Sequence, residues 1–144
     1  MHDVAAYVLS RRGPMSAMKL QKLLYYAQAW HLVWDDRPLF DEHIEAWANG
    51  PVIPALYAEH RGQFSIEVWP SGDPDGLSEG ERESVDVVLE FYGDMTAHQL
   101  SELTHREGPW RDTREAAGVA PMERSSAVIT PAAMQEYYLS VYDA

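Results

Sequence analysis

Residues 18–34, MKLQKLLYYAQAWHLVW, decide the fold. At 100° per residue, one arc of a helix collects most of their apolar side chains. These are Leu20, Leu23, Leu24, Ala27, Trp30, His31 and Trp34. The rest of the helix surface is hardly more polar, because it carries Tyr25, Tyr26, Leu32 and Val33. A helix that is apolar nearly all round belongs in the interior, so the sequence predicts a central buried helix with His31 as a hydrogen-bonded core residue.

Shorter helices are predicted on both sides of this central helix. Before it, Asp3 can cap a helix that stops at Gly13-Pro14. After it, a short helix is expected between Pro54 and Gly62, and another over residues 110–118. Two capping-box motifs begin further helices, namely Ser78-x-x-Glu81 and Thr96-x-x-Gln99. A final helix over residues 131–142, after Thr130-Pro131, is predicted to pack on the core.

In two segments, residues 39–48 and 63–69, apolar side chains alternate with polar, charged or large ones. The period of two residues is that of a strand. We predict that the two segments pair with each other. The predicted fold class is therefore mainly α: a compact single-domain helical bundle around a central buried helix, with a small two-stranded β element. The 144 residues suit one domain spanning 1–144. A chain of this length buries about two thirds of its unfolded surface, so it needs no disulfide or metal to fold.

The composition excludes several classes of function. Eleven Lys and Arg residues stand against 23 Asp and Glu, a net charge of −12. Nucleic acids and anionic membranes are bound through clustered bases, so we expect neither as a partner. The absence of cysteine rules out thiol nucleophiles, disulfides, cysteine zinc sites and iron–sulfur clusters. With no long apolar run and no signal-peptide core, the expected location is cytoplasmic.

No motif supplies a coherent catalytic set. The sequence lacks HExxH, G-x-S-x-G and both glycine-rich phosphate loops, so we expect no catalytic residue, metal or cofactor. One enzymatic alternative is a hydrolase that uses Glu59, His60 and His105. A basic group near the N-terminus is interpreted either as structural ion pairs or as a contact for an acidic partner, the first being favoured. Its members are Arg11, Arg12, Lys19 and Lys22.

Three stretches resemble one known family. They are residues 18–31, MKLQKLLYYAQAWH; Pro38-Leu-Phe together with residues 45–52, EAWANGPV, and Leu56-Tyr57; and Leu100-Ser with residues 103–110, LTHREGPW. In order and spacing they resemble the Panacea domain, also called the SocA-like or phage-associated domain, over about residues 3–118. The chain departs from the family pattern at Arg37, where glycine is frequent.

The resemblance implies a mostly helical antitoxin of a toxin–antitoxin pair that binds its toxin directly, without enzymatic activity. One SocA-like member is instead a proteolytic adaptor, so delivery of a toxin to an ATP-dependent protease is an alternative. Because Trp and Tyr near short loops often anchor interfaces, we predict a partner-binding surface around the Asn49-Gly50-Pro51 turn and the Gly108-Pro109 break. Its residues are Trp47, Asn49, Pro51, Tyr57, His105 and Trp110. Whether the chain forms a homo-oligomer is left open.

Overall fold

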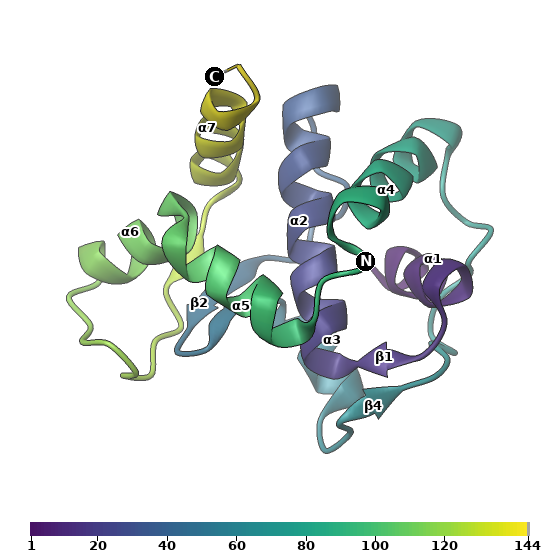
Figure 1. The fold of residues 1–144 in the computed structure, drawn as a ribbon, viewed down its shortest axis with the longest axis horizontal. Coiled ribbons are helices and arrows are strands. Elements are labelled where there is room, and N and C mark those ends of the chain that lie inside the picture. Colours follow the sequence, from purple (N-terminus) through teal and green to yellow (C-terminus); the bar gives the residue numbers. More distant parts are fainter. Residues whose placement is uncertain (144) are drawn as a thin grey trace.

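The computed structural model describes residues 1–143 and confirms a mainly α fold, with seven helices and five short strands in that range (Figure 1). The elements are α1 His2–Arg12, β1 Met15–Ser16, α2 Ala17–Asp35, β2 Ile44–Trp47, β3 Gly50–Val52, α3 Pro54–His60, β4 Ser65–Ile66, α4 Glu79–Tyr92, α5 Ala97–Arg106, α6 Gly108–Ala116, β5 Val128–Ile129 and α7 Pro131–Tyr142. Among them, no helix combines the length and the apolar character needed to cross a membrane.

Helix α2 is the centre of the fold, as predicted. Residues 20–29 are all buried, and α2 packs most extensively on α4 and α7. Figure 1 shows α2 upright in the middle, with α1 and α4 on one side and α5, α6 and α7 on the other. The helix begins where the Ser16 hydroxyl accepts a hydrogen bond from the Lys19 amide at 3.1 Å, and it ends at Asp36, whose φ is +55°.

Helix α7 closes the core on one side of α2 through a buried polar cluster. The hydroxyls of Tyr26 and Tyr138 both donate to Glu107 Oε1, at 2.6 and 2.9 Å. The Tyr138 hydroxyl also lies 3.0 Å from that of Tyr25. Burial raises the pKa of the Glu107 carboxyl, whereas the two tyrosine hydroxyls that it accepts from favour its charged form. Three distant segments, α2, the α5–α6 junction and α7, are thereby joined.

Helix starts follow the predicted caps with one exception. Both capping boxes are present, at Ser78 with Glu81 and at Thr96 with Gln99, and the Thr130 hydroxyl caps α7. Asp3, however, is not the cap of α1, because that helix already begins at His2. Its carboxylate instead accepts a hydrogen bond from the Asp73 amide at 2.9 Å, which fastens the loop before α4 to the N-terminus.

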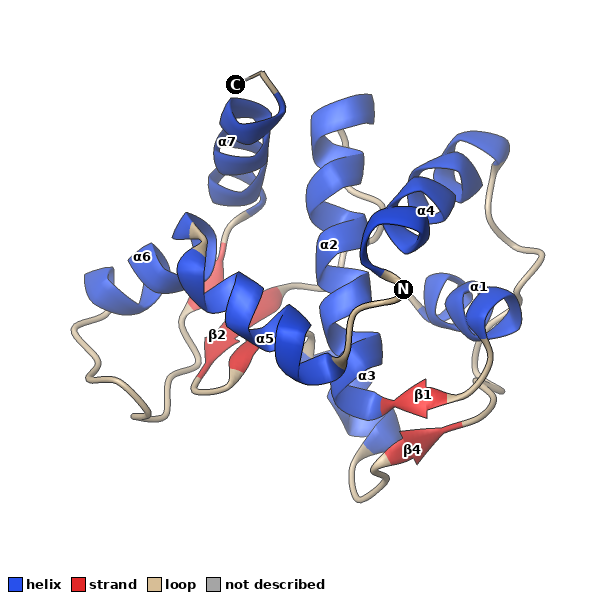
Figure 2. Ribbon diagram, viewed as in Figure 1, coloured by secondary structure: helices blue, strands red, loops and turns tan. Residues whose placement is uncertain are grey.

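The predicted strand pairing is wrong. Strand β2 pairs with β3, with Trp47 opposite Gly50, and on its other edge with β5 (Figure 2). Strand β4 pairs with β1, with Ile66 opposite Met15. The chain turns back immediately after Trp47, so Gly50 and Pro51, which follow the predicted strand over residues 39–48, supply its partner. In the second segment Ile66 and Trp69 are buried, whereas Phe64 and Val68 face solvent.

Polar side chains of α2 hold the following loop against the helix. The Gln28 amide bonds the backbone of Leu39 and Phe40, and the Gln21 amide bonds Ile53 N and O. His31 is buried, with Nδ1 2.8 Å from the Ser84 hydroxyl, which confirms its prediction as a hydrogen-bonded core residue. The Gln28 and Gln21 hydrogen bonds hold residues 39, 40 and 53 against α2, and so position the turn between β2 and β3.

The N-terminal basic group makes structural contacts, as the favoured interpretation predicted. Arg12 forms an ion pair with Asp94 at 2.8 Å, and Arg11 lies 3.7 Å from Asp86. Lys19 Nζ donates to Gly93 O at 2.7 Å, at the C-terminal end of α4, where a cation is favourable. The fourth member, Lys22, donates to Pro51 O in the turn between β2 and β3.

Candidate functional site

The turn between β2 and β3 is built on a buried lysine. Gly50 has a φ of +123°, a region that only glycine adopts easily. A Cβ at this position would stand 2.7 Å from Lys22 Cε. Lys22 is 1% exposed, and its ammonium donates to Pro51 O at 3.0 Å. Burial lowers the pKa of this amine to about 8. The turn and the lysine are therefore packed as one unit.

Helices α5 and α6 hold the turn from the other side. The Ser101 hydroxyl donates to Asn49 O at 2.7 Å, and Trp110 Nε1 donates to Trp47 O at 2.8 Å. The indole of Trp47 is also oriented, because its Nε1 donates to Glu45 Oε1 at 2.8 Å. The first two bonds join α5 and α6 to the turn, and the third orients the Trp47 indole. The turn is therefore held on this side as well.

The rings of His105 and Trp110 form a stack beside the turn. Their centroids are 4.0 Å apart with 5° between the planes, and the Arg114 guanidinium lies 5.2 Å from the Trp110 ring. Burial lowers the pKa of His105. Backbone hydrogen bonding at Asn49 opposes this shift and the Lys22 and Arg114 cations add to it, so the net effect lowers the pKa and favours the neutral imidazole. Its Nε2 is buried without a hydrogen-bond partner among residues 1–143.

Tyr57, on α3, extends this group of rings toward solvent. Its ring meets Trp47 edge to face at 5.1 Å and His60 at 5.4 Å. His60 is buried, and its Nε2 lies 2.9 Å from Gln21 Nε2. Because the Gln21 oxygen already accepts from Ile53 N, its nitrogen faces His60 and donates, so the imidazole is a neutral acceptor.

The residues of the hydrolase alternative are not assembled into a catalytic set. The Glu59 carboxylate is exposed and accepts a hydrogen bond from Ser71, while His60 is engaged with Gln21. Within residues 1–143, no hydrogen bond or ion pair joins Glu59, His60 and His105. The described part of the chain also contains no group of three His, Asp or Glu side chains placed to hold a metal ion. The geometry therefore gives the hydrolase no support.

The six predicted partner-binding residues lie around this one turn, and we call them the turn surface. They are Trp47, Asn49, Pro51, Tyr57, His105 and Trp110. Asn49 and Tyr57 are exposed, Trp47, His105 and Trp110 are half-buried, and Pro51 is buried. Pro51 and the nitrogen of Trp110 thus serve the turn itself, and the surface open to a partner centres on Trp47, Asn49 and Tyr57.

Several residues that build the turn surface were not predicted, above all Lys22 and Arg114. Arg114 is 4% exposed and donates to Ala46 O, Ala120 O and Glu123 O, which holds the segment after α6 against β2. For Lys22 a signal existed, because a cation on a helix that is apolar all round must turn inward and find an acceptor. For Arg114 the sequence offered none, since its three acceptors are backbone carbonyls.

Comparison with known proteins places the chain in a family. The sequence model described as "Antitoxin SocA-like, Panacea domain" matches residues 20–111, from the first turn of α2 into α6. The chain belongs to the SocA-like Panacea domain family. All six residues of the turn surface fall inside the matched Panacea range, whereas β5 and α7 lie outside it. The predicted resemblance is confirmed.

A curated relative carries the same assignment. The protein named "Antitoxin SocA" from Caulobacter vibrioides is 35% identical over 115 residues, which cover 67% of this chain. The aligned part spans 58% of the length of that relative, so this Panacea-domain chain matches only part of it. No solved structure matches the chain.

Proposed function

We propose that this protein is an antitoxin that neutralises a cognate toxin by direct binding through the turn surface. It acts in the cytoplasm and requires no catalytic residue, metal or cofactor. Membership of the SocA-like Panacea family supports the antitoxin role. The choice of the turn surface as the toxin-binding site is supported by the Trp47–Tyr57 ring pair. This pair lies beside exposed Asn49, on a turn that hydrogen bonds hold from two sides.

The locked turn favours binding for an entropic reason. Ordering a flexible side chain at an interface costs about 0.5–1.5 kcal/mol, and a ring already fixed by its neighbours avoids most of that cost. The Trp47 indole is held by its hydrogen bond to Glu45, and the Tyr57 ring packs edge to face against that indole. Trp and Tyr are also the residues that most often dominate binding energies. The turn surface therefore offers apolar area at low entropic cost.

The test is growth rescue by co-expression with the toxic product of the neighbouring gene. Tyr57→Ala should stay folded, because the side chain is 36% exposed, and should lose rescue. Truncation of an interface anchor commonly costs about 2 kcal/mol, or about thirtyfold in affinity. The matched control is Phe64→Ala, which removes a ring that is 86% exposed outside the turn surface and should keep full rescue.

Circular dichroism on each variant separates loss of the interface from loss of the fold. Tyr57→Ala and Trp47→Ala that are folded and still rescue growth would refute the turn surface as the toxin-binding site. An immunoblot of the toxin in the same cells distinguishes masking from delivery to a protease. Masking leaves the toxin level unchanged, whereas an adaptor lowers it.

A further inference from the structure

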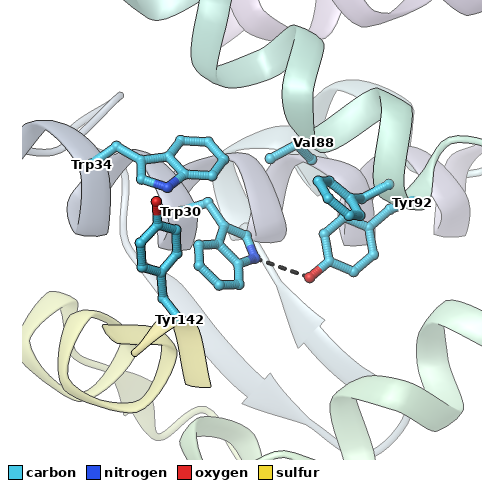
Figure 3. A pocket seen from close by; sticks show the side chains of 6 residues that line it. Trp30, Trp34, Val88, Tyr92 and Tyr142 are labelled. Atoms are coloured by element: carbon cyan, nitrogen blue, oxygen red, sulfur yellow. Dashed lines mark hydrogen bonds between the residues drawn. The ribbon is translucent and has the colours of Figure 1, made fainter. Parts of the chain in front are cut away.

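A second feature of the surface, far from the turn, is an apolar pocket where α2, α4 and α7 meet. It has a volume of about 180 Å³ and is lined almost wholly by rings (Figure 3). The lining residues are Trp30, Trp34, Val88, Phe91, Tyr92 and Tyr142. A cavity of about 150 Å³ is large enough for benzene, so this pocket has room for one aromatic or branched aliphatic side chain.

The walls of the pocket are held in place without a ligand. Trp30 Nε1 donates to the Tyr92 hydroxyl at 2.9 Å, the dashed contact in Figure 3. Tyr92 in turn stacks on Tyr26, with centroids 4.1 Å apart, and Trp30 stacks on Trp34 at 5.5 Å. The indole nitrogen of Trp30 is thus satisfied within the wall. What remains toward the opening is apolar ring surface, which gains free energy when it is covered.

Two rings of the pocket stand far out in solvent. Phe91 is 76% exposed and Tyr142 is 60% exposed, on opposite walls formed by α4 and α7. Single exposed apolar residues are ordinary, but two aromatic rings at the mouth of a ring-lined pocket form a continuous apolar patch, which is typical of interaction sites. Neither ring has a role in the turn surface.

The charge around the pocket selects the occupant. From Glu79 to Tyr92, α4 carries five acidic residues and one basic residue, Arg82, while Asp86 is paired with Arg11 and Glu90 lies beside Arg11 and Arg12. From Pro131 to Asp143, α7 and its cap carry two acidic residues and no basic one. The end of α2 adds Asp35 and Asp36, which are followed by Arg37. A segment that placed an apolar side chain in the pocket would cross this negative field, which favours Lys and Arg on either side of the anchor.

We propose that the pocket is a second docking site of the antitoxin, and that it takes an aromatic or branched aliphatic anchor from a basic segment of the toxin. The identity of this partner rests on the proposed function, whereas the location of the contact is independent of the turn surface. The toxin is then held at two places, at the turn surface and at the pocket between α2, α4 and α7.

The experiment measures the dissociation constant of purified toxin and antitoxin by calorimetry. Phe91→Ala combined with Tyr142→Ala should weaken binding about tenfold or more, because it removes both exposed walls. The fold should persist, since both rings are more than half exposed, and circular dichroism checks it. Phe64→Ala is again the matched control and should bind as wild type does.

A second arm tests the charge of the occupant. Glu83→Lys, at an exposed position of α4, should weaken binding at low salt and flatten its dependence on salt. An unchanged dissociation constant for the Phe91 and Tyr142 double variant overturns the proposal. So does self-association of the wild type that this variant abolishes while toxin affinity is unchanged, because a second copy of the chain then fills the pocket.

The variants separate this proposal from the proposed function. If Tyr57→Ala loses binding and the pocket variant does not, the turn surface stands and the pocket site falls. If only the pocket variant loses binding, the pocket site stands and the turn surface falls. A wild type that does not bind the toxin refutes both.

Discussion

Replacement of Gly50 by alanine tests whether the turn surface and α2 form one packed unit. An L-residue forced to a strongly positive φ costs about 1–3 kcal/mol. The new Cβ would also stand 2.7 Å from Lys22 Cε, within the contact distance of two carbons. Lys22 is buried and cannot swing into solvent, so the overlap displaces its ammonium from Pro51 O. Loss of a hydrogen bond from a buried charged group adds about 1.5–3 kcal/mol.

The two contributions predict that Gly50→Ala lowers the free energy of unfolding by about 2.5–6 kcal/mol. The matched control is Gly62→Ala, since Gly62 also has a positive φ, +84°, but nothing lies within 4 Å of the added Cβ. It should cost only the backbone contribution of about 1–3 kcal/mol. For a chain of this size, about 1 kcal/mol shifts Tm by about 3 °C, so the two variants should differ clearly in thermal melts.

Urea denaturation provides the free energies, and growth rescue provides the functional consequence. Gly50→Ala should lose neutralisation of the toxin more than Gly62→Ala does, because its strain falls within the turn surface. Equal free energies of unfolding for the two variants would refute the reasoning, since they would show that Lys22 yields freely to the new methyl group.

Two further perturbations test other parts of the structure. Burial holds the pKa of Lys22 at about 8, below its ordinary 10.5, so the folded protein loses this proton at lower pH than the unfolded chain does. The free energy of unfolding should therefore rise by about 2 kcal/mol between pH 7.5 and 9.5 relative to Lys22→Met, in which tyrosine ionisation is the same; parallel pH profiles from urea melts would contradict this. Arg114→Leu leaves three backbone carbonyls without their donor and should cost about 3 kcal/mol or more, with faster hydrogen exchange at residues 117–127, whereas exposed Arg111→Leu should have little effect on either measurement.

The features predicted correctly from the sequence are those determined locally. The central helix follows from the spacing of its apolar residues, and the starts of α4 and α5 follow from capping boxes whose partners are three residues apart. Strand pairing depends instead on which distant segments meet. The contact of Ile66 with Met15 joins strands about 50 residues apart, and nothing within either strand specifies the other.

The candidate site shows the same division. Its residues were predicted as a group, because the family resemblance covers both stretches that supply them. Their exposure could not be predicted, since it depends on how α6 lies against the turn. The Trp110 hydrogen bond to Trp47 spans 63 residues and leaves the Trp110 ring half-buried. Lys22 and Arg114 bond to backbone carbonyls, which every residue offers alike, so their partners leave no mark in the sequence.

The tie between Glu107, Tyr26 and Tyr138 has a consequence for the supply of new protein. Tyr138 of α7 completes this cluster, so until residues 131–142 have left the ribosome the Tyr25 hydroxyl and the Glu107 carboxyl lack that partner. Translation at about 5–20 residues per second adds the roughly 35 residues from Glu107 to the end of α7 in about 2–7 seconds. A cell that has lost its pool of this protein therefore regains the native fold one molecule at a time, and no nascent chain contributes before α7 is made.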